Sequence, residues 1–63
     1  MIKDKVKTII EKLTEDTNSI FSEKIYNLAA ELGIGDLHVK DSLHELIEEN
    51  YIDEPVIGVI KKI

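Results

Sequence analysis

The segment covering residues 36–52 constrains the fold of this chain more strongly than any other part of the sequence. Its branched apolar residues fall on one stripe of a helix with 3.6 residues per turn, at Val39, Leu43, Leu46 and Ile47. Such a stripe requires a hydrophobic core to cover it. Asp36 can cap the N-terminus of this helix, and Asn50 stands where helices commonly end in a left-handed residue. We therefore predict an amphipathic helix over residues 36–49.

Two further amphipathic helices precede this one. The first is predicted over residues 2–14, where five aliphatic residues form a narrow stripe: Ile2, Val6, Ile9, Ile10 and Leu13. The polar residues 14–19 then favour a loop, because their side chains compete for backbone hydrogen bonds. The second helix is predicted over residues 23–32, with a stripe formed by Ile25, Leu28, Ala29 and Leu32.

The second helix has signals at both of its ends. Ser22 is a favourable N-cap, and Phe21 and Tyr26 on either side of it have the spacing of a hydrophobic staple. Gly33 is expected to end the helix in the left-handed conformation. The short, glycine-bearing link that follows is typical of the turn in a helix-turn-helix unit, and we expect its Ile34 to point into the core.

After Asn50 the sequence changes to β-branched residues that suit paired strands. Pro55 and Gly58 can bracket a turn, so we predict a β-hairpin, or wing, over residues 51–63. Residues 20–21 can add a short third strand to this hairpin.

The order of these elements predicts an α+β fold. Three helices followed by a hairpin form one winged helix-turn-helix domain that covers residues 1–63. A plain three-helix bundle is the alternative, but it gives the β-branched residues 56–60 no role.

The composition excludes several classes of site. With 63 residues the chain makes one domain and has no room for a deep substrate pocket. The absence of cysteine excludes disulfides, thiolate metal sites and thiol chemistry, and it fits a reducing compartment. No segment is apolar over the roughly 18 residues that a membrane helix needs, and the N-terminus lacks the apolar run of a signal peptide. We therefore expect a cytoplasmic protein with no membrane partner.

No catalytic, cofactor or metal site is predicted, and the domain is not expected to be an enzyme. His38 and His44 lie about 120° apart around their helix, and no third ligand stands beside both. His38, Asp41 and Ser42 can meet on one face, but they lack an oxyanion site, so we interpret them as a surface hydrogen-bonding cluster. The Gly33-Ile34-Gly35 run lacks the preceding strand and third glycine of a phosphate-binding loop.

Nucleic-acid binding is a common role of a winged helix, because its recognition helix can enter the major groove. The charges oppose that role here. The net charge is −5, and the third helix sets Lys40 against four carboxylates: Asp41, Glu45, Glu48 and Glu49. A weak, salt-sensitive DNA contact remains open if the lysines that end the wing lie beside those of the first helix, which would join Lys61 and Lys62 to Lys3 and Lys7.

The expected wing tip is unusually apolar. It carries Val56 and Ile57, where a soluble monomer favours polar residues. These side chains either fold back onto the core or form an apolar contact for a protein partner. The sequence leaves both alternatives open, and we expect the isolated domain to be monomeric.

The wing also resembles a known sequence pattern. Glu54, Pro55 and Gly58 form a Glu-Pro-x-x-Gly run that resembles the wing at the C-terminal end of archaeal-type minichromosome-maintenance (MCM) replicative helicases. The resemblance covers residues 20–63 and also includes Gly33-Ile34, Val39 and Leu43-x-x-Leu46.

Two residues depart from this family pattern. Asn50 stands where the family often has glycine, although asparagine tolerates the left-handed conformation. Val59 stands where an aromatic residue is usual. Generic winged-helix regulators share the other features, so the Glu-Pro-x-x-Gly run carries most of the specificity.

The resemblance implies a small non-catalytic domain appended to a hexameric, ATP-driven DNA helicase whose ATPase elements lie outside these residues. It implies a regulatory or docking role, in which the domain modulates helicase and ATPase activity or contacts replication-initiator proteins at the nucleoid. The alternative is a free-standing winged-helix transcription regulator that binds DNA, for which a basic recognition helix would be expected.

Overall fold

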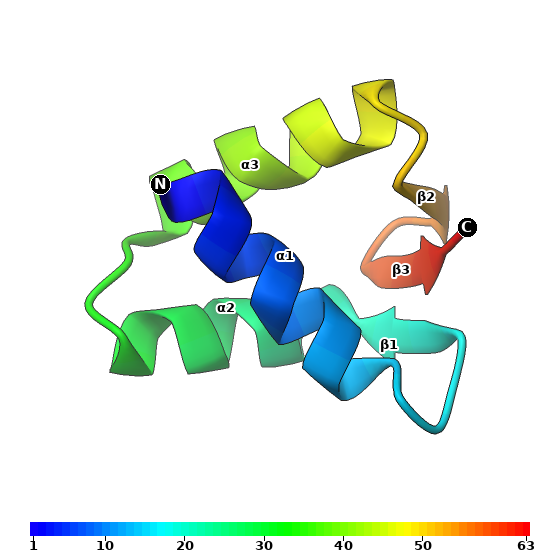
Figure 1. Ribbon diagram of the computed structural model, residues 1–63, viewed down its shortest axis with the longest axis horizontal. Coiled ribbons are helices and arrows are strands. Elements are labelled where there is room, and N and C mark those ends of the chain that lie inside the picture. Colours follow the sequence, from blue (N-terminus) through cyan, green and yellow to red (C-terminus); the bar gives the residue numbers. More distant parts are fainter.

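The computed structural model describes all 63 residues, in three helices and three strands (Figure 1). In chain order these are α1 (Ile2–Leu13), β1 (Ser19–Phe21), α2 (Ser22–Glu31), α3 (Asp36–Glu48), β2 (Ile52–Val56) and β3 (Val59–Lys62). The strands gather at one end of the molecule, where α3 leads into β2 (Figure 1). The predicted winged-helix α+β fold is confirmed, and each helix bound lies within one residue of its prediction. None of the helices has the length and apolar character needed to span a lipid bilayer.

The strands form one antiparallel sheet in the order β1-β3-β2. The predicted short strand near residue 20 is therefore present, and it pairs with β3 at the far side from β2. Ile20 and Ile60 are partners in this register, and both are buried. The sheet thus turns this pair toward the helices and joins the start of α2 to the C-terminal hairpin.

The core is a single cluster of twelve buried aliphatic residues: Val6, Ile9, Ile10, Ile20, Ile25, Ala29, Ile34, Val39, Leu43, Leu46, Ile52 and Ile60. Every helix and every strand supplies at least one of them. Burial of one such branched side chain stabilises a fold by roughly 1.5–3 kcal/mol, so a domain of this size depends on each of them.

The buried face of α3 differs slightly from the predicted stripe, because it includes Ser42 and only half buries Ile47. Val39, Leu43 and Leu46 are buried as expected, whereas Ile47 is half-buried. Ser42 is buried in its place, because it lies three residues after Val39 and so shares the same helical face. The predicted surface cluster around Ser42 is therefore wrong, and no side-chain hydrogen bond joins Ser42 to His38.

The predicted end of α2 at Gly33 is confirmed. Gly33 has a φ of 81°, and its N–H donates to the Ala30 carbonyl at 3.0 Å. The Ile34 N–H donates to the Ala29 carbonyl at 2.9 Å, which completes a Schellman motif. Ile34 is buried, as predicted, so this turn anchors the link between α2 and α3.

The same motif ends α3. Asn50 has a φ of 62°, and its N–H donates to the Ile47 carbonyl at 3.0 Å. The Tyr51 N–H donates to the Leu46 carbonyl at 3.0 Å. The left-handed residue predicted at Asn50 is therefore present, and it directs the chain from α3 into the wing.

The predicted N-caps are wrong by one residue. Ser22 and Asp36 lie inside the first turns of their helices, whose N-caps are Phe21 and Gly35 without side-chain cap bonds. At α2 the reason is that the Ser22 N–H donates to the Gly58 carbonyl at 2.9 Å. The wing therefore supplies an acceptor for one of the N–H groups at the start of α2 that have no partner within the helix.

The hydrophobic staple positions are also shifted by one residue, because the N-cap is Phe21. The residue before the N-cap and the fourth residue of the helix are now Ile20 and Ile25, and both are buried. Phe21 is 65% exposed, so its predicted staple contact with Tyr26 is wrong. The cause is that β1 continues through Phe21 and turns its side chain away from the core.

The hairpin turn is also tighter than predicted. Pro55 lies within β2, and the turn consists of Ile57 and Gly58, between the paired residues Val56 and Val59. The register shifts between Asp53 and Val56, which marks a β-bulge. Since β2 is an edge strand, the missing N–H of Pro55 costs no hydrogen bond in the centre of the sheet.

Leu32 departs from the predicted stripe of α2. It is 60% exposed, whereas Ile25 and Ala29 are buried and Leu28 is half-buried. The helix ends at Glu31, so Leu32 is its C-cap and lies beyond the last turn that faces the core.

Leu46→Ala should lower the free energy of unfolding by about 2–5 kcal/mol, because it removes part of a fully buried side chain and leaves a cavity in the core. Leu37 on the same helix is 71% exposed and gives a matched control. We expect Leu37→Ala to change the free energy of unfolding by no more than about 0.5 kcal/mol. Urea titration measures both, and equal effects of the two changes would contradict the observed orientation of α3.

Candidate functional site

The outer face of the sheet carries a continuous row of apolar side chains. Phe21 pairs with Val59 across β1 and β3, and Val56 pairs with Val59 across β2 and β3. Residues opposite one another in paired strands point to the same side of the sheet. Because Ile60 faces the core, its neighbour Val59 faces outward, and so do its two partners.

Ile57 follows Val56 in the turn at the tip of the hairpin. It is 95% exposed, and Val56 is 63% exposed. Of the two alternatives left open by the sequence, folding back onto the core is therefore wrong, and an apolar surface remains. We call the set of Phe21, Val56, Ile57 and Val59 the wing row.

Hydrogen bonds fix the turn that bears the wing row. The Gly58 N–H donates to Glu54 Oε2 at 2.9 Å, and the Gly58 carbonyl accepts from the Ser22 N–H at 2.9 Å. Gly58 has a φ of 90°, in the region that favours glycine. The turn is thus bonded both to its own strand and to the first turn of α2.

A polar row lies next to the wing row on the same face. Ser19 pairs with Lys61, and Lys61 pairs with Asp53. Lys61 is exposed there, whereas the following Lys62 points to the opposite side of the sheet. The two wing lysines therefore do not form one patch.

Lys62 does lie near the first helix, as predicted for the wing lysines. Its Nζ is 5.6 Å from the centre of the Tyr51 ring, and Lys7 Nζ from α1 is 4.6 Å from the same ring. Tyr51 thus attracts both ammonium groups by cation–π interaction. The Tyr51 hydroxyl donates to Glu11 Oε2 at 2.7 Å, which fixes the ring against α1.

Burial and the hydrogen bond to Glu11 raise the pKa of Tyr51 to about 12. The phenol therefore stays protonated at neutral pH and keeps donating to the carboxylate. Lys7, Lys62 and Glu11 all meet at this ring, so two of the lysines predicted to contact DNA already have partners within the domain.

Lys3 also has a partner. Its Nζ lies 2.6 Å from Glu49 Oε2, at the C-terminal end of α3. This hydrogen bond is the main reason why the pKa of Lys3 is raised. Of the four lysines predicted for DNA contact, Lys3 is ion-paired, Lys7 and Lys62 contact Tyr51, and Lys61 lies on the outer face of the sheet.

The exposed face of α3 is acidic, as predicted. Asp41, Glu45 and Glu48 are exposed on it. His38 and His44 are also exposed, and no three residues of the His, Cys, Asp and Glu types lie close enough together to hold a metal ion. This face therefore presents carboxylates where a DNA-reading helix presents cations.

A small polar pocket of about 130 Å³ lies where α2, α3 and β2 meet, and is lined by Ser22, Tyr26, Lys40, Leu43, His44 and Glu54. Burial raises the pKa of Tyr26, and the charges of Asp36 and Glu54 add to this effect. Its volume is below that of typical ligand pockets, which hold about 300–1,000 Å³.

Sequence reasoning found two of the four wing-row residues. It missed Phe21 and Val59, because their shared face follows from the register of β1 on β3. The alternation of buried Ile20 with its neighbours is the one signal that could have assigned Phe21 to the outer face. Tyr51 was also missed as the group that joins the lysines of α1 and β3.

No protein-family model, curated protein or solved structure matches this chain. The fold and its surfaces define a small winged-helix domain with an acidic third helix and an exposed apolar wing.

The folded state should hold the phenolic proton of Tyr51 more tightly than the unfolded chain does. The resulting stability is fully present below pH 10 and is lost as the pH rises through about 12. Tyr51→Phe should remove the part of the alkaline loss of stability that comes from ionisation of Tyr51. Denaturant unfolding at a series of alkaline pH values measures this difference.

Glu11→Gln tests whether Glu11 contributes to the raised pKa of Tyr51. It should lower the pKa of Tyr51 in an absorbance titration of tyrosinate, without restoring the ordinary value, because burial is the larger cause. A Tyr51 that titrates at its ordinary pKa in the unaltered protein would contradict the contact with Glu11.

Proposed function

We propose that this chain is a non-catalytic winged-helix domain that docks on a protein partner through the wing row. The observation that carries the proposal is the exposure of Phe21 and Val56 on either side of Val59 on the outer face of the sheet, with exposed Ile57 at the adjoining hairpin tip. Contiguous apolar surface of this kind on a small domain marks an interaction site. Aromatic and branched aliphatic side chains of this type act as anchors in protein interfaces.

The geometry of the wing supports docking in a second way. The hydrogen bonds of Gly58 to Glu54 and Ser22 restrict the turn, and Pro55 restricts the strand before it. A surface that is already ordered loses less entropy on binding than a flexible loop does. The wing row therefore meets its partner with little rearrangement.

Electrostatics favour a protein over DNA as the main partner. Counterion release by Lys or Arg drives non-specific DNA binding, and the exposed face of α3 offers carboxylates instead. Each carboxylate near a phosphate costs about 1 kcal/mol even at the dielectric constant of water. Lys7 and Lys62, which lie together at Tyr51, give at most a weak, salt-sensitive DNA contact.

For the identity of the partner, we propose the remainder of an archaeal-type MCM helicase or a replication-initiator protein. The Glu54-Pro55-x-x-Gly58 run supports this proposal, and the bond between Glu54 and the Gly58 N–H gives the run a structural role in closing the wing. In this role the domain modulates the ATPase and unwinding activity of the parent helicase, in the cytoplasm at the nucleoid.

The double change Val56→Ser/Ile57→Ser should leave the melting temperature of the domain nearly unchanged, because both side chains are exposed. It should weaken binding to the ATPase portion of an archaeal-type MCM helicase, or to an origin-binding initiator protein, by at least about tenfold. Calorimetric titration measures this loss. Leu37→Ser/Ile63→Ser removes two comparably exposed aliphatic side chains elsewhere and serves as the matched control.

Two results would contradict the proposal. One is unchanged affinity for a partner that binds the unaltered domain. The other is sub-micromolar, sequence-specific binding of duplex DNA that is lost on changing His38 and survives Lys61→Ala/Lys62→Ala. That second result would favour the free-standing transcription regulator, because base contacts by the third helix would then determine affinity.

A further inference from the structure

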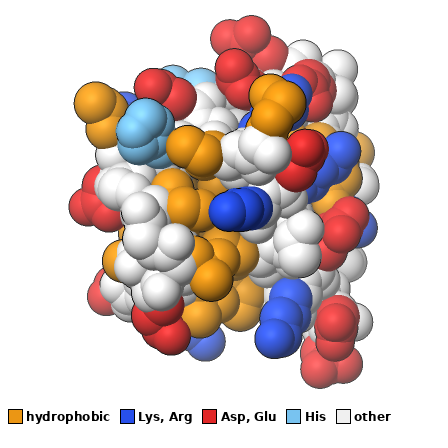
Figure 2. Space-filling view, turned by 60° about the vertical axis from the view of Figure 1, so that its left-hand side comes forward, with side chains coloured by type: hydrophobic (Ala, Val, Ile, Leu, Met, Phe, Trp, Pro, Cys, Tyr) orange, Lys and Arg blue, Asp and Glu red, His pale blue; other side chains and the backbone are white.

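A second apolar surface lies between α1 and α2, away from the wing row. It is an open groove of about 350 Å³, with an apolar floor of Ile9, Leu28 and Leu32 and a polar rim of Lys5, Thr8, Lys12 and Glu31. Figure 2 shows hydrophobic side chains in a strip down this side of the molecule, with lysines along one edge. The groove and the wing row share no residue.

The rim of the groove is positive, although the chain as a whole has a net charge of −5. Lys5 and Lys12 contribute two cations against the single carboxylate of Glu31. Neither lysine belongs to an ion pair, since the two pairs in the structure join Met1 to Asp4 and Lys3 to Glu49. These ammonium groups are therefore available to an incoming anion.

The distance between Lys5 and Lys12 matches the spacing of side chains on one face of a bound helix. Lys5 and Lys12 are separated by two turns of α1, or roughly 10 Å along its axis. Two carboxylates seven residues apart on an added helix have the same separation. Leu28 on α2 and Leu32 at its C-cap, four residues apart, supply the apolar floor on the other side of the groove from these lysines.

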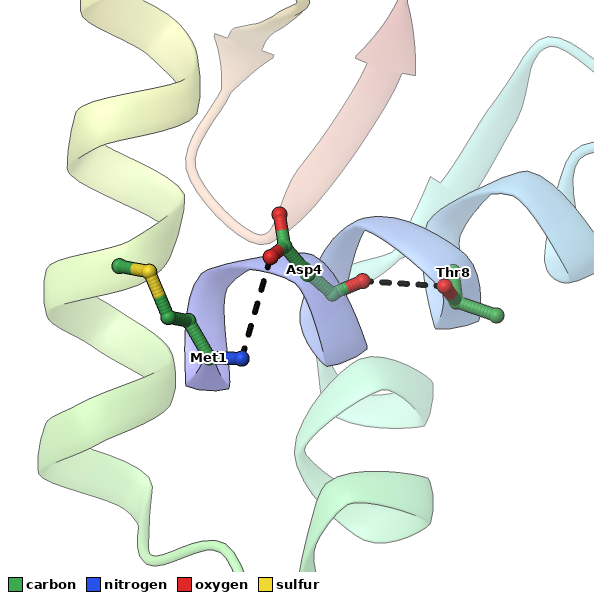
Figure 3. A network of polar contacts seen from close by, with 3 residues as sticks. All are labelled: Met1, Asp4 and Thr8. Carbon is green, nitrogen blue, oxygen red and sulfur yellow. Dashed lines mark hydrogen bonds and ion pairs between the residues drawn. The ribbon is translucent and has the colours of Figure 1, made fainter.

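The Thr8 hydroxyl, between Lys5 and Lys12 on α1, already has a hydrogen-bond acceptor. The Thr8 hydroxyl donates to the Asp4 carbonyl at 3.0 Å within α1 (Figure 3). Figure 3 also shows the ion pair between the Asp4 side chain and the Met1 amino group, which are 3.8 Å apart. Thr8 therefore adds no free donor to the groove. Recognition must come from the apolar floor and the two lysines.

We propose that this groove binds an acidic amphipathic helix of a protein partner. Its aliphatic side chains fill the space between Ile9, Leu28 and Leu32, and its carboxylates meet Lys5 and Lys12. A helix laid in an apolar groove is a recurrent mode of peptide recognition, with anchors at intervals of three and four residues. The ridges of α1 and α2 provide the surface that such a helix packs against.

A second copy of this chain fits the groove less well. Its most acidic surface is the exposed face of α3, and Leu37 is the one large exposed aliphatic residue on that helix. That face would supply carboxylates but not the row of apolar anchors that the groove needs. The chemistry therefore favours a separate polypeptide whose helix is both acidic and aliphatic.

The test uses the full chain and two synthetic helical peptides of equal length. One peptide carries leucines at one-turn intervals, with two glutamates seven residues apart beside them, and the control peptide has lysines in place of the glutamates. Amide chemical-shift mapping should place the acidic peptide on the residues of the groove. Fluorescence anisotropy should show at least tenfold weaker binding of the control peptide, and weaker binding of the acidic peptide at high salt.

Variants of the domain complete the test. Lys5→Glu/Lys12→Glu should weaken binding of the acidic peptide at least tenfold, whereas Lys24→Glu/Lys40→Glu, which changes the net charge equally at exposed sites, should leave it within twofold. Leu32→Ser should also weaken it, and Leu37→Ser should not. Circular dichroism checks that each variant is folded.

The proposal is overturned if neither peptide binds saturably, if both bind equally, or if the shifts fall on α3 or the wing. It is also overturned if the chain sediments as a dimer that Leu32→Ser dissociates, because a second copy would then occupy the groove. These outcomes leave the docking role of the wing row unaffected, because that role rests on other residues and a separate assay.

Discussion

Gly58 makes two hydrogen bonds that link the hairpin turn to the edge strand and to the start of α2. Its carbonyl accepts from the Ser22 N–H and so satisfies a donor at the start of α2, while its own N–H is bonded to Glu54. One residue thereby connects the hairpin turn, the edge strand and a helix. The closure of the wing uses this arrangement, in which Gly58 has a φ of 90°, a conformation that favours glycine.

Much of the fold follows from local pattern, because the helices of a small domain have one face in the core and the other in water. The stripe of α3 and the left-handed residues Gly33 and Asn50 could be read from the chain in this way. Features that depend on strand pairing could not. The sequence around Ser22 does not indicate that its N–H donates to a carbonyl of the wing. The position of Pro55 inside β2 depends on a bulge in the pairing of β2 with β3.

The same limit applies to the candidate site. Val56 and Ile57 could be singled out by their chemistry, but whether they were buried depended on the register of the hairpin. Lys3 and Lys7 could be expected to face solvent, yet their partners Glu49 and Tyr51 lie more than 40 residues away in the sequence. Contacts between such distant residues arise from packing, and periodicity within one helix does not encode them.

The distribution of charge separates the surfaces of the domain. Carboxylates dominate the exposed face of α3, two lysines of α1 line the groove against α2, and the wing tip is apolar. A domain of 63 residues has a free energy of unfolding of roughly 3–9 kcal/mol, so exposed apolar residues are retained at some risk of aggregation. The interaction role that we propose fits this combination of surfaces better than DNA reading does.

We propose that the wing tip is an ordered docking element rather than a flexible loop. Nitrogen-15 relaxation of the Val56, Ile57 and Gly58 amides in the isolated domain tests this claim most directly. The account predicts order parameters of about 0.85, equal to those of the helices, because both hydrogen-bonding groups of Gly58 have partners. Order parameters below about 0.6 at these three residues would contradict it.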